Sequence, residues 1–326
     1  MFRMYRLAFA TTIVATIFSF VIGPAAAQDY PNRPIKLIVP WPPGGGTDVI
    51  GRLLAAKLSI SLGQQVVVEN RAGAASIVGM TAVATAPADG YTIGLATSNL
   101  AVNPSLYPKI PYDAAADLAP VILVSKGVYA LAVHPGVAAN TVSELVAITR
   151  AAPGKYNASL IGPGTPPHLA LAQFNSLTGA NVIGIHYKGA GPSTTAAIAG
   201  ETQMVFASYA TLKPMIQSGR LRLLAVTSAK RSSAAPDVPT VIESGLPGFL
   251  FEEWYALFAP AKTPRAAIDR INAEVRKVLV MADVRERMDG LASEPSPGAP
   301  EALGDLLRTE MVRWSKIVRE AGIKIE

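Results

Sequence analysis

The sequence contains no cysteine, and this absence excludes disulfide bridges, thiolate nucleophiles and thiolate metal ligands. Histidine is rare as well: the chain has three, His134, His168 and His186, and no two stand at the spacing of a helical metal pair. A G-x-S-x-G nucleophile elbow is also missing. We therefore expect no enzyme, no catalytic residue, no metal and no cofactor. Scattered Asp and Glu residues leave a hydrolytic enzyme as the less favoured alternative.

Charge is sparse too, since charged residues make up only 16% of the chain while half of its residues are apolar. This balance is typical of a well-packed globular protein and argues against disorder. The basic residues are scattered and form no cluster with interleaved aromatic side chains, so we expect no nucleic-acid partner. A length of 326 residues allows two domains with separate cores or one large α/β domain.

The N-terminal segment has the pattern of a secretory signal peptide. Arg3 and Arg6 precede an apolar run at residues 7–22, and three alanines at residues 25–27 provide a cleavage site. Removing residues 1–27 lowers the formal charge from +6 to +4, because two arginines and no acidic residue are lost. No second apolar run of spanning length follows, so we expect a periplasmic protein whose mature chain is not inserted in the membrane.

The rest of the chain alternates short apolar runs with helical patterns, which favours an α/β fold built from β-α-β units. The first half predicts strands at residues 35–39, 65–68, 92–96 and 121–124 and helices at residues 48–62 and 77–86. The second half predicts strands at residues 130–133, 156–161, 182–186, 204–207 and 221–227 and helices at residues 142–150, 168–178 and 194–199.

The C-terminal part predicts a return to the first half of the fold. A stretch at residues 228–249, rich in Ser, Ala, Pro and Gly, precedes a strand at residues 253–258. Amphipathic helices follow from residue 264 and at residues 300–321. We expect one lobe from residues 28–124 and 252–326, and a second lobe from residues 125–251.

The most informative loop, at residues 41–48, lies between a predicted strand and a predicted helix and contains Gly44, Gly45 and Gly46. We call it the first glycine loop. Glycines let the backbone approach a ligand, and a helix start offers free N–H groups and the positive end of a dipole. No Gly-Lys-Ser/Thr follows, and Val49 replaces the third glycine of a dinucleotide fingerprint. The alternative is a tight turn in which Asp48 only caps the helix.

A second glycine loop, at residues 187–192, repeats this arrangement in the other half of the chain. It contains Gly189 and Gly191 and again lies between a predicted strand and a predicted helix. Two such loops on facing lobes would clamp an anion, which raises the weight of the binding hypothesis above that of a simple turn.

Together with these loops, four further segments resemble the substrate-binding receptors of tripartite tricarboxylate transporters, the TctC-like Bug family. They are G-P-G-T-P-P-H-L-A at residues 162–170, P-Y-D at 111–113, L-A-V-T-S at 224–228 and P-D-V-P-T at 236–240. The resemblance covers essentially all of the predicted mature chain. It implies a two-lobe type II periplasmic-binding-protein fold with a hinge and an interlobe cleft. It also implies a small organic acid as ligand, membrane transporter subunits as partners, and a monomer.

The resemblance further implies which residues contact the ligand. Gly44, Gly45 and Thr47 would donate hydrogen bonds, Trp41 would form a wall, and Asp48 would cap the helix and face the ligand. His168 is expected to bond to its own loop in preference to the ligand. The remaining implied ligand-binding residues are Ser98, Asn99, Gly164, Thr165, Tyr187, Lys188, Gly189, Gly191 and Ser208.

Two departures from the family pattern bear on the ligand. Many relatives have an Asp after the residue that aligns with Phe206, where this chain has Ala207 and Ser208, and another Asp where this chain has Ala196. An acid in the cleft often receives an ammonium group, so its loss predicts a ligand without an amino group. A periplasmic sensor module would use the same site, and the sequence does not separate it from a transport receptor.

Overall fold

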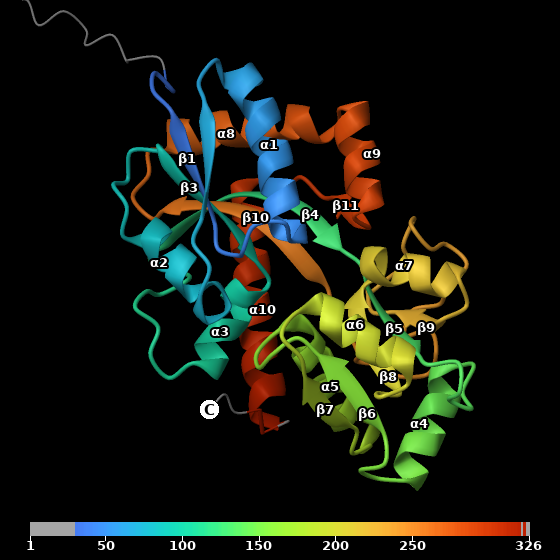
Figure 1. Ribbon diagram of the computed structural model, residues 1–326. Helices are drawn as coiled ribbons and strands as arrows, with labels where there is room; N and C mark the ends of the chain where they lie inside the picture. The colour runs from blue at the N-terminus through green and yellow to red at the C-terminus, as the bar shows by residue number, and fades with distance from the viewer. Residues whose placement is uncertain (1–29, 321, 324–326) are drawn as a thin grey trace, which may run out of the picture.

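The computed structural model describes residues 30–320 and 322–323. The predicted signal peptide, residues 1–27, lies outside these residues, as does Ala321, the predicted end of the last helix. The described chain forms a six-stranded sheet and a five-stranded sheet, each covered by helices (Figure 1). Below, the six-stranded sheet is called sheet A and the five-stranded sheet is called sheet B.

Sheet A has the strand order β11-β4-β10-β3-β1-β2. Its strands are β1 (Ile35–Val39), β2 (Val66–Asn70), β3 (Thr92–Thr97), β4 (Leu118–Gly127), β10 (Glu253–Pro260) and β11 (Ser293–Pro295). The strands β1, β2 and β3 run parallel, as the β-α-β pattern predicts, whereas β10 is antiparallel to both of its neighbours. The strand β10 enters sheet A after the chain has returned from sheet B.

Sheet B has the strand order β7-β6-β8-β5-β9 and the same mixture of directions. Its strands are β5 (Tyr129–Val133), β6 (Asn157–Leu160), β7 (Ile183–His186), β8 (Met204–Ser208) and β9 (Arg222–Val226). The strands β6, β7 and β8 are parallel, and β5 lies antiparallel between β8 and β9. In both sheets the three parallel strands therefore have their carboxyl ends at one edge, where loops lead into helices.

The helices on the side of sheet A are α1 (Gly46–Leu62), η1 (Ala74–Ser76), α2 (Ile77–Ala84), α3 (Asn99–Leu106), α8 (Arg265–Leu279), α9 (Ala282–Gly290) and α10 (Pro300–Glu320). Those on the side of sheet B are α4 (Val142–Ala151), α5 (Pro166–Thr178), α6 (Ala190–Ala199) and α7 (Tyr209–Gln217). The sequence analysis missed α3, α7 and α9. Pro104 and Pro214 lie inside α3 and α7, and proline is the residue that most strongly argues against a helix interior.

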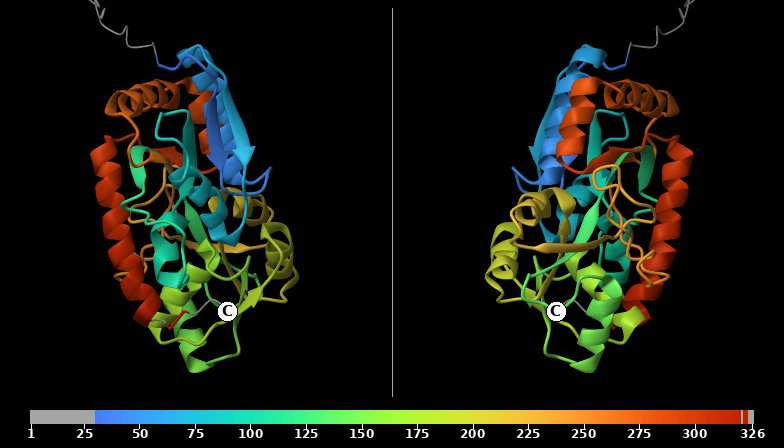
Figure 2. Two further views of the ribbon diagram at one scale, coloured as in Figure 1. Left: turned by 90° about the vertical axis from the view of Figure 1, so that its left-hand side faces the viewer. Right: turned by 90° about the vertical axis from the view of Figure 1, so that its right-hand side faces the viewer.

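The chain passes between the sheets from β4 to β5 and again from β9 to β10. The strands of sheet A thus come from the two ends of the described chain and those of sheet B from its middle. The lobes predicted at residues 28–124 with 252–326 and at 125–251 remain a proposal, with which this sorting of strands agrees. The helix α10 extends along one side of the molecule past both sheets (Figure 2).

The core beneath α10 contains large aromatic side chains from segments far apart in the sequence. Trp314 of α10 is 1% exposed, and its ring centroid lies 5.8 Å from that of Phe251. Arg313, beside it, donates from Nη1 to the carbonyl oxygen of Leu250 at 2.6 Å. These contacts attach α10 to the segment that returns from sheet B to sheet A.

No helix in residues 30–320 has both the length and the apolar character required to cross a membrane.

Replacing Trp314 by alanine should lower the free energy of unfolding by about 3–5 kcal/mol, because a large buried aromatic side chain is lost and a cavity remains. Val312 of the same helix is 74% exposed, so Val312→Ala should change the free energy by less than about 0.5 kcal/mol. Urea denaturation followed by circular dichroism measures both changes. Equal effects of the two substitutions would contradict the packing of α10 described here.

Candidate ligand-binding site

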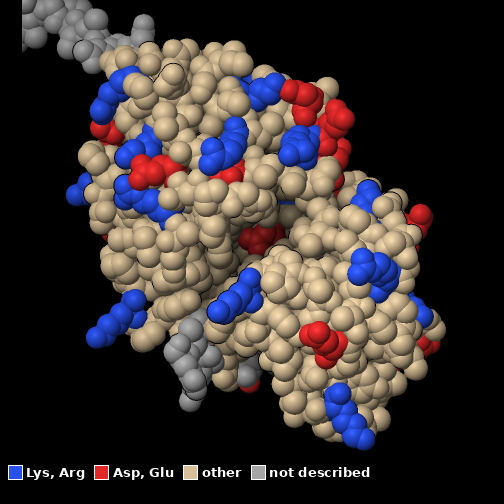
Figure 3. All heavy atoms as spheres, viewed as in Figure 1, with Lys and Arg blue, Asp and Glu red and all other residues tan. Residues whose placement is uncertain are grey.

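A cavity of about 540 Å³, here called the central cavity, is lined by residues from both sheets and their helices. Trp41, Gly45 and Thr47 reach it from the first glycine loop and the start of α1, and Ser208 reaches it from the end of β8. The molecular surface is hollowed between its two parts, and acidic atoms lie deep in this hollow (Figure 3). The central cavity therefore occupies the place of the predicted interlobe cleft.

Four helices begin at the central cavity. Gly46 of α1, Pro166 of α5, Ala190 of α6 and Ala210 of α7 all line it, and each lies in the first turn of its helix. This convergence follows from the topology, because the helices start where parallel strands end. The first N–H groups of a helix have no acceptor inside the helix, and together they represent a partial positive charge. The first two residues of α5 are prolines without an N–H group, so α1, α6 and α7 supply these donors at the cavity. The described lining contains no Lys, Arg or His, so these helix ends are its main positive feature.

Asp48 holds the first glycine loop in shape. Its Oδ2 accepts a hydrogen bond from the backbone N–H of Gly44 at 2.9 Å and another from Nε of Arg52 at 2.9 Å. Its Oδ1 accepts from Nδ2 of Asn70 at 2.8 Å, and the same nitrogen donates to the carbonyl oxygen of Trp41 at 3.0 Å. The side chain of Asp48 thus bonds the loop to Arg52 of α1 and to Asn70 at the end of β2, and it does not line the central cavity.

Electrostatics agree with this bracing role. The Arg52 guanidinium lowers the pKa of Asp48 to about 2, and the N–H of Gly44 and the amide of Asn70 act in the same direction, against the effect of burial. Helix α1 has its N-cap at Gly45, and Gly44 has φ +85°, a conformation that favours glycine. The sequence therefore places a glycine where the turn needs one and an ionised carboxylate where it can hold that turn.

The segment around Gly164 joins the two halves of the chain beside the central cavity. Nδ2 of Asn99, at the start of α3, donates to the carbonyl oxygen of Gly164 at 3.1 Å. Thr165 donates from its hydroxyl to the carbonyl oxygen of Gly162 at 2.6 Å, and the N–H of Gly164 donates to Nδ1 of His168 at 3.0 Å. His168 is thus bonded to its own loop, as predicted, and Asn99, Gly164 and Thr165 do not line the cavity.

The second glycine loop approaches the central cavity through Ala190, a residue that the sequence analysis did not select. Gly189 is the N-cap of α6 with φ +108°, Lys188 is exposed, and the hydroxyl of Tyr187 lies 3.4 Å from Oε2 of Glu201. Of the predicted ligand-binding residues, Trp41, Gly45, Thr47 and Ser208 line the cavity. The other predicted ligand-binding residues do not line it: Gly44, Asp48, Ser98, Asn99, Gly164, Thr165, Tyr187, Lys188, Gly189 and Gly191.

Sequence reasoning missed Glu253, the one charged side chain among the described residues that line the central cavity. Glu253 opens β10, is only 4% exposed, and its Oε2 has no hydrogen-bond partner within the described chain. Burial raises the pKa of its carboxyl group to about 7, and the hydroxyl and N–H of Ser98 act in the opposite direction. The sequence signal was weak, because one acid at the start of a strand usually faces solvent.

Glu253 corrects one step of the sequence analysis. The hypothesis of a ligand without an amino group assumed that no acid lies in the cleft, because Ala196 and Ala207 replace acids of relatives. That assumption was wrong, since a buried acid enters the central cavity from β10, a strand distant in sequence from both alanines.

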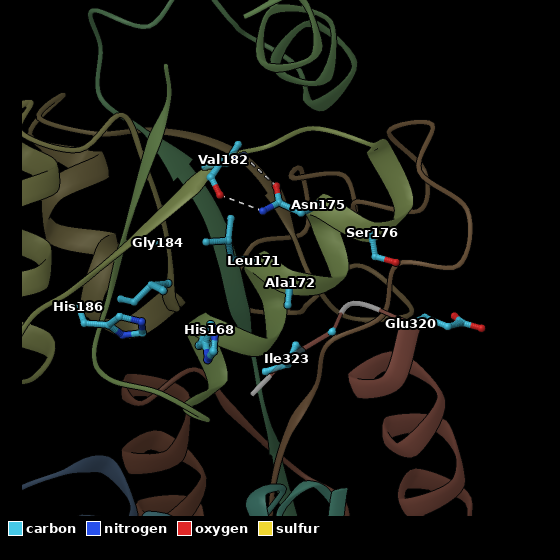
Figure 4. Close-up of a pocket in the computed structure, with 12 residues that line it drawn as sticks. His168, Leu171, Ala172, Asn175, Ser176, Val182, Gly184, His186, Glu320 and Ile323 are labelled. Carbon is cyan, nitrogen blue, oxygen red and sulfur yellow. Dashed lines mark hydrogen bonds between the residues drawn. The ribbon is translucent and has the colours of Figure 1, made fainter. Parts of the chain in front are cut away.

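A second cavity, of about 500 Å³, lies between α5, sheet B and the end of α10, and here it is called the histidine cavity (Figure 4). The rings of His168 and His186 meet edge to face there, with centroids 5.3 Å apart. Burial, and to a lesser extent His186, lowers the pKa of His168 to about 4. In the part of the chain that the structure describes, no three His, Asp or Glu side chains gather as a metal site would require.

Comparison with known proteins gives a consistent result. The family model described as "Tripartite tricarboxylate transporter family receptor" matches residues 50–323. The chain is 38% identical to Protein BugT of Bordetella pertussis over 323 residues, which cover 97% of this chain and 99% of that protein.

Two solved structures are similar along most of their length. One is an R. palustris protein with adipate, with a TM-score of 0.81 and 31% identity over 91% of this chain and 99% of the other. The second is MatC from Rhodopseudomonas palustris with bound malate, with a TM-score of 0.77 and 29% identity over 89% and 100%. The predicted two-lobe periplasmic-binding-protein fold is thereby confirmed.

Replacing Asp48 by asparagine should lower the free energy of unfolding by about 1–2 kcal/mol at pH 7, since the partner Arg52 is half exposed and the pair is partly screened. The pKa of Asp48 is lowered in the folded protein, so its contribution is complete above the unfolded value and is lost as the pH falls through about 2. The difference between wild type and variant should therefore shrink between about pH 5 and pH 2.

Urea denaturation at a series of pH values measures this difference. Asp269→Asn is the matched control, because Asp269 also pairs with an arginine four residues away but is 53% exposed, and its replacement should have little effect. A penalty for Asp48→Asn that stays constant down to about pH 2.5 would contradict the bracing role.

Proposed function

This chain belongs to the tripartite tricarboxylate transporter family of receptors, and on that basis we propose that it captures a small carboxylate in its central cavity. It is a periplasmic solute-binding receptor, as this family membership shows. Relatives of the same fold were solved with adipate and with malate, both of which have carboxylate groups. These two ligands support a carboxylate as the class of solute for this chain.

The observation that best supports the proposal is that four helices begin at the central cavity. Their N-terminal ends are the positive feature of this cavity, because none of the described residues that line it is Lys, Arg or His. A carboxylate would accept hydrogen bonds from the N–H groups of Gly46 and Thr47 and from the Thr47 hydroxyl. Each charge-assisted bond contributes about 1.5–3 kcal/mol, and a helix dipole adds up to about 1 kcal/mol. A few such contacts account for the roughly 8 kcal/mol of a micromolar complex.

The other predicted ligand-binding residues enter the proposal in two roles. Trp41, Gly45 and Ser208 line the central cavity and would touch the ligand directly. Asp48 and Asn99 would act indirectly, since Asp48 holds the first glycine loop and Asn99 donates a buried hydrogen bond to Gly164 in the other half of the chain. The remaining predicted residues would position the residues that line the central cavity. They are Ser98, Thr165 and, in the second glycine loop, Tyr187, Lys188, Gly189 and Gly191.

Lobe closure would convert binding into a signal for the transporter. The two lobes would rotate about the crossings from β4 to β5 and from β9 to β10. A ligand favours the closed form only to the extent that it touches both lobes, and the central cavity has lining residues from both. We propose that the chain acts as a monomer, delivers its ligand to membrane transporter subunits, and binds and releases the ligand without chemical change.

A thermal-shift screen tests the proposed ligand class. Mono-, di- and tricarboxylates should raise the melting temperature, because a ligand that binds the native state at about 100 times its Kd stabilises it by about 2.7 kcal/mol. Amides of the same acids should have no effect, since they lack the negative charge that the helix ends attract. Equal shifts by acids and amides, or no shift by any acid, would contradict the proposal.

Gly45→Val tests the place of binding. Gly45 has ordinary extended backbone angles, and a Cβ built on it meets no atom closer than 3.8 Å, so valine should preserve the fold while its methyl groups fill ligand space. The melting-temperature response to acids should disappear. Gly298→Val, at a glycine with a nearest contact of 3.9 Å outside the cavity lining, should keep the response. Loss of both responses, or of neither, would argue against the central cavity as the binding site.

A further inference from the structure

The central cavity has two electrical poles. The start of α1, at Gly46 and Thr47, supplies the positive end of a helix dipole. Glu253 supplies the negative pole, and none of the described residues that line the cavity is a Lys, Arg or His that could neutralise it. The second negative charge of a dianionic ligand would therefore be repelled by Glu253, the one charged side chain in the described lining.

The phenol ring of Tyr255 lies near both poles. A Cβ built on Gly127, the residue that pairs with Glu253, would lie 3.3 Å from Cε2 of Tyr255 and 3.4 Å from Cβ of Glu253. A Cβ built on Gly46 would lie 3.8 Å from the Tyr255 hydroxyl. The phenol end of Tyr255 thus lies beside both Gly46 and the pair Gly127 and Glu253, so a ligand that reaches from one pole to the other would pass along this ring.

The surroundings of Glu253 suit a cation. Oε2 of Glu253 and Oγ1 of Thr97 are buried without a hydrogen-bond partner in the described chain, and both residues line the central cavity. Three aromatic residues, Trp41, Tyr129 and Tyr255, line it as well. Aromatic faces attract ammonium groups, and a desolvated carboxylate gains most from a positive partner.

We propose that Glu253 makes this receptor selective for acids that have a positively charged nitrogen at the end opposite to the carboxylate. The carboxylate would bind at the start of α1, the nitrogen would pair with Glu253, and a chain of methylene groups would lie against apolar lining residues such as Ile50, Ile161 and Leu291. This assignment rests on the proposed function, because it takes the carboxylate position from it.

The titration of Glu253 agrees with the geometry. Burial raises the pKa of this carboxyl group to about 7, and the groups that face it are Tyr129, Tyr255 and Ser98, none of them basic. An ammonium ligand requires the ionised carboxylate, so binding should strengthen as the pH rises through 7. A second carboxylate on the ligand would instead require the neutral carboxyl group, and its binding should weaken over the same range.

Isothermal titration calorimetry with 5-aminopentanoate, pentanoate and glutarate tests the assignment, because these acids have the same chain length and differ at one end. At pH 8 the wild type should bind 5-aminopentanoate at least about tenfold more tightly than glutarate. Glu253→Gln should weaken 5-aminopentanoate by about tenfold or more while changing pentanoate by less than about twofold. Between pH 8 and pH 6 the wild type should lose about tenfold in affinity for 5-aminopentanoate, and the variant should not.

Glu252→Gln is the matched control, since Glu252 precedes Glu253 in the chain but pairs with Lys126 and does not line the central cavity. This variant should keep the wild-type ratio of the affinities for 5-aminopentanoate and glutarate. Melting temperatures of all variants check that they are folded. A wild-type preference for glutarate, or an unchanged ratio in Glu253→Gln, would overturn the role of Glu253 while leaving carboxylate capture in place. If none of the three acids bound, this inference would fail, and the thermal-shift screen over other acids would decide whether carboxylate capture fails with it.

Discussion

The central constraint in this structure is that helices begin where parallel strands end, and that both sheets direct these points at one cavity. The starts of α1, α5, α6 and α7 all reach the central cavity, while the described lining offers no basic side chain. Attraction for an anion then depends on backbone N–H groups and helix dipoles, which cannot move away from the cavity as a lysine side chain can. The proposed position of the site and the proposed class of ligand both follow from this arrangement.

Two carboxylates near the first glycine loop show how environment decides the role of one functional group. Asp48 accepts hydrogen bonds from Gly44, Arg52 and Asn70, so it is ionised, satisfied and devoted to the shape of the loop. Glu253 is buried without a cation, and one of its oxygens has no partner in the described chain. Because a desolvated charge gains most from an opposite charge, Glu253 is the group that distinguishes one acid from another.

Periodicity predicted much of the fold, including β1, α1, α4 and the strands of sheet B, because their apolar residues recur at the spacing that each structure needs. It failed for α3 and α7, where internal prolines concealed short helices that tertiary contacts stabilise. The direction of β10 was also beyond a local pattern, since alternation of apolar residues is the same in parallel and antiparallel strands.

For the site, the sequence by itself determined the two glycine loops, the helix that follows each of them, and the residues Trp41, Gly45 and Thr47 that the central cavity includes. These are local features, because a glycine turn before a helix is encoded within a few adjacent residues. Only the tertiary structure decided that Asp48 points away from the cavity and that Glu253 points into it. The physical reason is that the burial and the partners of a carboxylate depend on neighbours that are distant in the chain, and a single sequence does not display them.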